Sequence, residues 1–321
     1  GKCCVNEEDR QKAIAYVAKY PPLMEVIASG DNKISFRLRS GMQVDVRLLP
    51  PESFGAAMQY FTGSKAHNVA LRQRALKMGY TLNDIQGDVH MHTVETDGKN
   101  TIEEMAEAAK ARGYKYMAIT DHSKNLAFAN GLDDKRAVAH IARIRAANEK
   151  IEGIRIFAGI EVDILADGDL DLSDDVLAQM DIVIASVHSA MNQDSAKMTD
   201  RLLRAIHNPN TSIIGHPTGR KQPTRDAYPF DMHAILTAAA ERKVAMELNS
   251  YPERLDLNDV HLRQAKQHGV KIVINTDSHH TSHMEKIRYG LLQARRAWLT
   301  KDDVLNTRTT ETFSAAMKHG W

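Results

Sequence analysis

Nine histidine, aspartate and glutamate residues stand at or just beyond the ends of apolar runs in this sequence. They are His90, His92, Asp97, His122, Glu161, His188, His216, Asp277 and His279. All offer nitrogen or oxygen and none offers sulfur, which suits zinc, manganese or iron with a coordination position left open for water or substrate. Three or four protein ligands per ion, with one carboxylate shared, predict about three divalent ions.

The first two ligands lie two residues apart after Gly87-Asp88-Val89. Because alternate side chains of a strand share a face, the imidazoles of His90 and His92 are expected to project together. A histidine pair is common outside metal sites. Here, however, a histidine, aspartate or glutamate recurs at the end of one predicted strand after another, which favours metal binding. The other nine histidines are interpreted as hydrogen-bonded surface residues or similar: His67, His140, His207, His233, His261, His268, His280, His283 and His319.

Seven predicted strands alternate with predicted helices from residue 85 onward. The strands end at His92, His122, Glu161, His188, His216, Asn249 and Asp277. Helices are expected at 101–113, where Thr101-Ile-Glu-Glu104 is a capping box, and at 137–149, 196–207, 232–242 and 258–268. A further helix at 289–298 is expected to pack through Trp298. This alternation predicts a parallel sheet covered by helices. An open doubly wound sheet also fits, but a barrel is preferred because it brings the polar strand ends into one ring.

The composition is that of a globular protein with 321 residues, enough for one large or two ordinary domains. No apolar run approaches the roughly 20 residues that span a bilayer, and no signal peptide is expected. The two cysteines, Cys3 and Cys4, are adjacent and cannot join distant parts of a fold, so a cytoplasmic protein is expected. Net charge is +1, yet residues 33–77 carry eight basic and two acidic side chains. This excess suits a phosphate-bearing partner or a surface balanced by acids elsewhere.

The N-terminal part has a different pattern. Residues 7–19 have helical spacing, and 34–39 and 43–49 alternate as the strands of a hairpin. The stretch from Arg39 to Arg72 resembles the end of the palm and the start of the thumb of a bacterial family X DNA polymerase. The resemblance implies that Asp45 matches the third metal-binding carboxylate of the polymerase site. It also implies that nucleotide-lining positions are occupied by Tyr60, Phe61, Gly63, Asn68 and Arg72.

Two departures from the polymerase pattern limit this resemblance. The first two palm carboxylates lie on an upstream strand that this sequence does not contain, so no polymerase activity is expected, because nucleotidyl transfer needs carboxylates for two ions. The thumb is truncated, since the chain passes almost at once from Asn83 to Gly87. The expected domains are a partial palm and thumb fragment over 1–84 and a metallo-phosphoesterase domain over 85–321.

The ligand motifs follow one another as His-x-His, Asp-His, Gly-x-Glu, His-Ser, Gly-His-Pro and Asp-Ser-His. From Gly87 to about Trp298 these motifs and their order resemble the polymerase and histidinol phosphatase (PHP) family. The resemblance implies a distorted (β/α)7 barrel and a metal-dependent phosphoesterase. It further implies three ligand sets: His90, His92, Glu161 and Asp277; Glu161, His188 and His216; and Asp97, His122 and His279. Glu161 can bridge the first two sets, and a bridged pair of cations can activate water near neutral pH.

Cations near the ligands are candidates for holding phosphate. Lys124 lies two residues after His122, and Arg220 and Lys221 follow the Gly-His-Pro motif; each of these charges has the alternative of a solvated loop. The uncharged Asn249 and the cationic Arg254 are weaker candidates. The expected catalytic residues are Glu161, which holds the metals, and Lys124 and Arg220, which neutralise developing charge.

The polymerase-like fragment implies DNA as the substrate. The expected activity is a 3′→5′ exonuclease, with 3′-phosphatase or abasic-site cleavage as further activities. A phosphatase of small molecules such as histidinol phosphate uses the same metals and is the alternative, although the basic N-terminal fragment argues against it. A third interpretation, a non-catalytic DNA-binding module with structural metals, is disfavoured because no ligand is missing.

Overall fold

The computed structural model describes residues 7–30, 33–48 and 85–321. The chain divides into two compact units, Gly1–Met78 and Gly79–Trp321. Several residues singled out in the sequence lie outside the described ranges. These are Cys3, Cys4, Tyr60, Phe61, Gly63, His67, Asn68 and Arg72.

The first unit contains a three-stranded antiparallel sheet with the order β1-β2-β3. Its elements are α1 (Glu7–Val17), β1 (Leu23–Gly30), β2 (Lys33–Leu38) and β3 (Gln43–Arg47). The predicted hairpin is confirmed, with Ile34 opposite Val46 and Phe36 opposite Val44. Ile34 and Phe36 are buried in one cluster with Ile14 of α1, as expected when alternate positions of a strand face the core. β1 escaped prediction because nearly all of its side chains are exposed and show no alternation.

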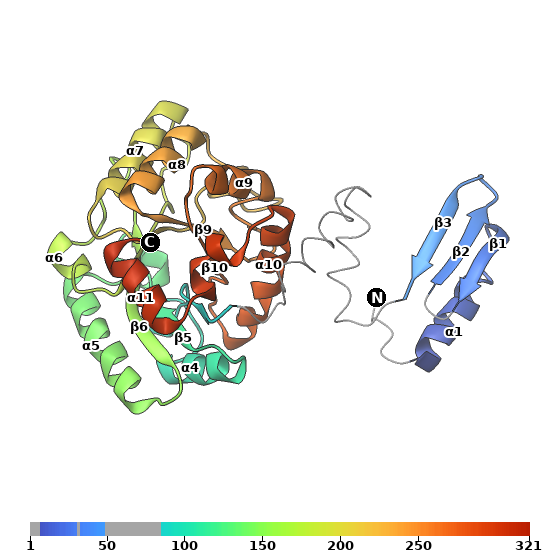
Figure 1. The fold of residues 1–321 in the computed structure, drawn as a ribbon, viewed down its shortest axis with the longest axis horizontal. Helices are drawn as coiled ribbons and strands as arrows, with labels where there is room; N and C mark the ends of the chain where they lie inside the picture. Colours follow the sequence, from blue (N-terminus) through green and yellow to red (C-terminus); the bar gives the residue numbers. More distant parts are fainter. Residues whose placement is uncertain (1–6, 31–32, 49–84) are drawn as a thin grey trace. The chain divides into compact units, whose positions relative to one another are not determined.

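The second unit is a seven-stranded parallel sheet whose spatial order follows the chain from β4 to β10. The strands are β4 (Gly87–Asp88), β5 (Tyr116–Ile119), β6 (Arg155–Asp163), β7 (Ile182–Ser186), β8 (Ile213–Ile214), β9 (Ala245–Asn249) and β10 (Ile272–Asn275). Figure 1 shows helices surrounding these strands: α4 (Ile102–Ala111), α5 (Asp134–Lys150), α6 (Asp174–Leu177), α7 (Ser195–His207), α8 (Met232–Arg242), α9 (Asp259–Gln267) and α10 (Ile287–Arg296). The predicted capping box of Thr101 opens α4. Among the described residues, every helix falls short of the length and apolarity that crossing a bilayer demands.

The sheet nearly closes into a barrel, because the segments that follow β4 and β10 meet in an isolated bridge. This arrangement disfavours the open doubly wound alternative. At the C-terminal end, Met91 and Ser278 form a parallel bridge. There the amide of His92 donates to the Ser278 carbonyl at 2.9 Å. Further down, the Asn306 side chain stands between the strands. It donates to the carbonyls of Gly87 and Ile274 at 2.8 and 2.6 Å and accepts from the Ile274 amide at 3.0 Å. The barrel is therefore distorted, with a side chain replacing part of one ladder.

Replacing Asn306 by alanine is expected to lower the free energy of unfolding of the barrel by about 2–4 kcal/mol. The variant leaves three buried backbone groups unpaired, and each such group costs about 1–3 kcal/mol before relaxation. Urea unfolding followed by tryptophan fluorescence measures the effect, because both tryptophans, Trp298 and Trp321, lie in this unit. Replacement of the exposed Asn192 by alanine is the matched control. An equal midpoint for both variants would contradict the structural role of Asn306.

The barrel interior is apolar at one end and polar at the other. Inward side chains near the strand starts, such as Phe157, Ile182 and Val273, form a cluster with Phe313 of α11 (Thr310–His319). The rings of Phe313 and Tyr116 stack with centroids 4.7 Å apart, and Figure 1 shows α11 drawn across the barrel. We infer that α11 fills the N-terminal end. The same inward register, continued by steps of two residues, presents polar side chains at the opposite end.

Candidate metal centre

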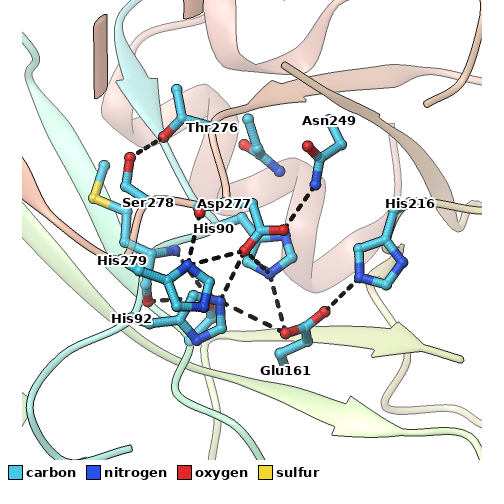
Figure 2. Close-up of polar contacts among 12 residues, drawn as sticks. His90, His92, Glu161, His216, Asn249, Thr276, Asp277, Ser278 and His279 are labelled. Atoms are coloured by element: carbon cyan, nitrogen blue, oxygen red, sulfur yellow. Dashed lines mark hydrogen bonds and ion pairs between the residues drawn. The ribbon is translucent and has the colours of Figure 1, made fainter. Parts of the chain in front are cut away.

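The structure gathers all nine predicted ligands at the C-terminal end of the barrel, around Glu161. The Glu161 Oε2 atom lies 3.3 Å from His90 Nε2 and 2.9 Å from His122 Nδ1. Its Oε1 atom lies 3.4 Å from His188 Nε2 and 3.0 Å from His216 Nε2. The two oxygens thus face different imidazoles, as Figure 2 shows for His90 and His216. A carboxylate placed in this way is able to bridge two cations.

Two other carboxylates extend the cluster. Asp277 Oδ1 lies 3.2 Å from His92 Nε2. Asp97 presents Oδ1 to His122 Nε2 at 3.6 Å and Oδ2 to His279 Nε2 at 3.3 Å. Asp97 comes from the loop after β4, and Gly98 beside it folds back on the strand end: a Cβ at this position would lie 2.5 Å from the His92 carbonyl oxygen. A side chain there would displace the loop that carries Asp97.

Three groups of side chains each have ligand atoms within 4.8 Å of one another. They are His90, His92 and Asp277; His122, Glu161 and His188; and His92, Asp97, His122 and His279. The first and third groups overlap the first and third ligand sets that the sequence resemblance implied. The second group differs, because His122 stands where His216 was expected, although His216 also contacts Glu161. His122 lies between two groups, so it can serve either.

The chemistry of the donors fits metal ions. Seven buried atoms of the cluster lack a hydrogen-bond partner in the described structure: His90 Nε2, both ring nitrogens of His92, Asp97 Oδ1, His122 Nδ1, Glu161 Oε2 and His216 Nδ1. Buried polar atoms are nearly always paired, because leaving one unpaired costs free energy. Cations bound among these atoms would supply the missing partners without sulfur ligands.

Opposite charges set the protonation of the cluster. Burial opposes ionisation of Glu161, but the charges of His90, His188 and His122 outweigh it and hold the Glu161 pKa well below its usual value. Burial also disfavours the charged form of His188, yet Glu161 and Asp163 raise its pKa to about 9. His279 behaves in the same way through Asp97 and Asp277, with a pKa of about 9. The metal-free centre therefore holds protons on imidazoles that metal ions must displace.

Metal binding is expected to depend steeply on pH. At pH 7 the imidazoles of His90, His188 and His279, whose pKa values are all raised, are protonated in the metal-free protein, so zinc binding should release about three protons per chain. Affinity should rise as pH rises toward 9, because fewer protons are displaced, and should fall as pH falls. Calorimetric titration in buffers of different ionisation enthalpy measures the released protons. A binding heat that is the same in every buffer would contradict this prediction.

Sequence reasoning missed a buried carboxylate behind the ligands, Glu247 of β9. Its Oε1 lies 2.6 Å from His90 Nδ1, and its Oε2 accepts a hydrogen bond from the His216 amide at 2.7 Å. Asn275 and Asn249 donate to the same carboxylate at 3.0 and 3.3 Å. A carboxylate on the far nitrogen of a ligating histidine fixes the tautomer and the ring orientation. Its position two residues before Asn249, on the inward face of β9, was the signal available in the sequence.

Two further buried aspartates were missed as well. Asp163 Oδ1 lies 2.5 Å from His188 Nδ1 and thereby orients this ligand. Asp121 accepts from the Thr93 amide at 2.8 Å and the Thr96 hydroxyl at 2.5 Å, which fixes the loop between His92 and Asp97. His140 also lies 2.8 Å from Asp121. His140 is therefore hydrogen-bonded as interpreted, but it is buried rather than on the surface.

A cavity of about 320 Å³ opens onto the cluster. Its walls include the ligands Asp97, His122, Glu161, His188, Asp277 and His279 together with Leu126, Phe128, Lys221, Tyr251, Arg254 and His283. This volume is at the lower end of the range of about 300–1,000 Å³ for small-molecule sites. Arg254 Nε lies 3.7 Å from Asp277 Oδ2, and its buried Nη1 has no hydrogen-bond partner. One guanidinium group thus faces the cluster directly.

Two of the cationic side chains expected near phosphate, those of Lys124 and Arg220, are engaged away from the cavity. Lys124 pairs with Asp134 at 3.6 Å on the exposed side of its loop. The Arg220 guanidinium donates to the carbonyls of Arg254 and Leu255, the first at 2.6 Å. Lys221, in contrast, lines the cavity. Arg220 therefore supports the loop that carries Arg254, and the cavity wall itself contains Arg254 and Lys221.

Comparisons with known proteins match both parts of the chain. Residues 88–304 match the PHP domain family, and residues 57–107 match the DNA polymerase beta thumb family. The "DNA polymerase/3'-5' exonuclease PolX" of Bacillus subtilis is 38% identical over 354 residues, an alignment that covers 93% of this chain and 62% of that protein. The chain thus spans about three fifths of that relative's length. A probable phosphatase of Thermoanaerobacter sp. (strain X514) is 32% identical over 231 residues, covering 68% of this chain and 89% of that protein.

Solved structures resemble the chain more distantly. Histidinol phosphate phosphatase of Lactococcus lactis, solved with zinc, L-histidinol and phosphate, has a TM-score of 0.47 and 18% sequence identity. The match covers 66% of this chain and 94% of that chain.

Proposed function

This chain belongs to the PHP domain family, and from that premise we propose that it is a metal-dependent phosphoesterase that acts on the 3′ ends of DNA. The observation that carries the proposal is the placement of Glu161, whose two oxygens face different imidazoles beside an open cavity. About three ions of zinc, manganese or iron would be held by the nine predicted ligands. When bound, such ions supply Lewis-acid polarisation of a phosphoryl group and activation of water.

The protein's own groups position the ligands and the substrate. Glu247 and Asp163 hold His90 and His188 through their Nδ1 atoms, which leaves each Nε2 directed at Glu161. Arg254, with a buried Nη1 that has no partner, is placed to receive a phosphate oxygen from the cavity. We assign charge neutralisation to Arg254 and Lys221 in place of Arg220 and Lys124, whose charged groups are engaged elsewhere.

Three features favour DNA as the substrate. The Bacillus subtilis relative is named as a 3′-5′ exonuclease, residues 57–107 match a polymerase thumb, and residues 33–77 have a net charge of +6 that suits a phosphate backbone. The proposed reaction is 3′→5′ release of nucleotides, with 3′-phosphatase or abasic-site cleavage as related activities. A cytoplasmic location belongs to the same proposal.

We do not assign nucleotidyl transfer to this chain. Asp45, the position that matches a polymerase carboxylate, accepts a hydrogen bond from Ser35 and lies 3.7 Å from the Lys33 ammonium. Its side chain is about half exposed on β3. One such carboxylate does not hold the two ions that nucleotidyl transfer uses.

A small-molecule phosphomonoesterase is the second candidate. It is favoured by the Thermoanaerobacter relative, which is named a probable phosphatase, is 32% identical to this chain and is covered over 89% of its length by the alignment. Such an enzyme would use the same metals and the same cavity. The two candidates differ in whether a nucleic acid or a small ester is turned over.

The test compares the two substrate classes directly. Manganese-dependent nucleotide release from single-stranded DNA with a 3′-hydroxyl is measured beside phosphate release from histidinol phosphate. His188→Ala should lose activity, and His207→Ala, on an exposed helix end, is the matched control. Intact DNA with turnover of histidinol phosphate would refute the exonuclease proposal. No turnover of either substrate, with no metal bound, would refute the enzyme itself.

A further inference from the structure

A phenylalanine side chain is almost fully exposed to solvent at the wall of the cavity that opens onto the predicted ligands. Phe128 is 88% exposed, more than any other large apolar side chain of the described residues. It nevertheless lines the cavity together with Glu161, His188 and Asp277. Exposing an aromatic ring to water forgoes the free energy of its burial. Single exposed apolar side chains are common on protein surfaces, but this ring lies in the wall of a cavity beside the predicted ligands, where a bound molecule would contact it.

The segment that carries Phe128 is well anchored. It follows His122, and the Leu132 amide returns to the His122 carbonyl at 2.8 Å. Asn130 donates to the Glu95 carbonyl at 2.9 Å, and Leu126 is buried. Phe128 therefore projects from a short 3-10 turn, Ala127–Ala129, whose two sides are both fixed to the barrel. The exposure of the ring is a property of a defined loop.

Among the described residues of the cavity wall, Tyr251 carries the other six-membered aromatic ring, and neighbouring side chains already contact this ring. Lys286 Nζ lies 3.2 Å from the ring centroid of Tyr251, and the His283 ring meets Tyr251 edge-on at 5.6 Å. These two contacts hold Tyr251 in the wall. Phe128, by its exposure, is the ring with a face open to a ligand.

We propose that Phe128 stacks on the base of the 3′-terminal nucleotide while its phosphodiester lies at the metal cluster. The inference rests on the proposed function, and it identifies the terminal base as a part of the substrate that the cavity wall binds. Flat aromatic rings beside a path for the phosphate backbone are how proteins hold single-stranded nucleic acid without sequence preference, because every base has a π-face. The phosphate is held by charge at Arg254 and Lys221, so the phenyl ring adds recognition of the base.

The experiment uses two single-stranded oligonucleotides that differ only at the 3′-terminal residue, which is a thymidine or an abasic nucleotide. Release of this residue is measured at varied substrate concentration. Phe128→Ala should raise KM for the base-bearing end about ten-fold with little change in kcat, as expected when stacking contributes equally to ground and transition states. The abasic end should react alike with both proteins. Phe128→Trp should restore the KM for the base-bearing end.

Val138→Ala, an exposed apolar replacement on α5 outside the cavity wall, controls for surface effects. Equal KM values for Phe128→Ala and the parent protein on the base-bearing end would overturn the stacking assignment and leave the exonuclease proposal standing. Equal losses on both ends would also overturn it, because they would mean a general role of the loop. A parent protein that cleaves neither oligonucleotide but hydrolyses histidinol phosphate would refute the proposed function and this inference together.

Discussion

Glu161→Gln is expected to reduce phosphoester hydrolysis by at least about 10³-fold and to lower the metal content of the purified protein. The substitution keeps the volume but replaces one oxygen with an amide NH₂, which cannot ligate a cation. In the structure both oxygens are used, Oε2 toward His90 and His122 and Oε1 toward His188 and His216. The loss should exceed the about 10²–10³-fold effect of deleting one transition-state hydrogen bond, because each of the two oxygens would hold an ion.

Elemental analysis and rate measurement on one preparation test this expectation. Glu152→Gln, an exposed substitution on the segment before β6, is the matched control and should behave as the parent protein. Tryptophan fluorescence and circular dichroism establish that the variant is folded. A folded Glu161→Gln protein with full metal content and a rate within ten-fold of the parent would show that Glu161 does not bridge ions.

The ligands could be found from sequence because their positions follow from local pattern. An apolar run of four to six residues predicts a strand, and inward side chains recur every second residue, so Glu161 follows from Phe157 and Asp277 from Val273. Parallel strands covered by helices then place all the C-terminal ends on one side. The barrel and the gathering of ligands needed no information about long-range contacts beyond this.

The closure of the barrel could not be found in the same way. Asn306 bonds to the Gly87 carbonyl across 219 positions of sequence, and nothing in the residues around it distinguishes it from a loop asparagine. The filling of the barrel by Phe313 of α11 is equally non-local. Such contacts depend on which elements meet in space. The periodicity of apolar residues, in contrast, indicates only which face of an element is buried.

The directions in which loop side chains point could not be predicted from the sequence either. Arg220 and Arg254 are both near the end of a strand, but only Arg254 enters the cavity wall, while Arg220 bonds to backbone carbonyls. Two ligands, His216 and Asp277, have φ angles of 28° and 53°, a region that residues other than glycine rarely adopt. Backbone held in this region clusters at functional sites, and the surrounding structure determines it.

Glu247→Gln is expected to weaken metal binding and phosphoester hydrolysis by about 10–100-fold, the usual cost of losing a partner behind a metal ligand. The carboxylate is fully buried and receives four hydrogen-bond contacts, all from groups that are able to donate: His90, His216, Asn249 and Asn275. A glutamine offers one acceptor oxygen, and its NH₂ group must face donors. His90 would then lose either its partner or its orientation toward Glu161.

The effect of Glu247→Gln should be visible in metal affinity before it is visible in folding. Titration of the metal-free variant with zinc measures affinity, and urea unfolding of the same metal-free protein measures stability. Glu241→Gln, an exposed change at the end of α8, is the control. Glu247→Asp keeps the charge and should restore part of the affinity. An affinity unchanged in Glu247→Gln would mean that His90 is oriented without this carboxylate.

The contrast between the two glutamates follows from which side of the imidazoles each one meets. Glu161 faces the Nε2 atom of His90 and so shares the space in which a cation binds, whereas Glu247 faces the Nδ1 atom of the same ring. The first substitution should therefore remove ions, and the second should leave ions bound more weakly by a ring that can turn. Zinc added in excess should recover activity in Glu247→Gln and not in Glu161→Gln, because mass action restores occupancy only where the ligand atoms remain.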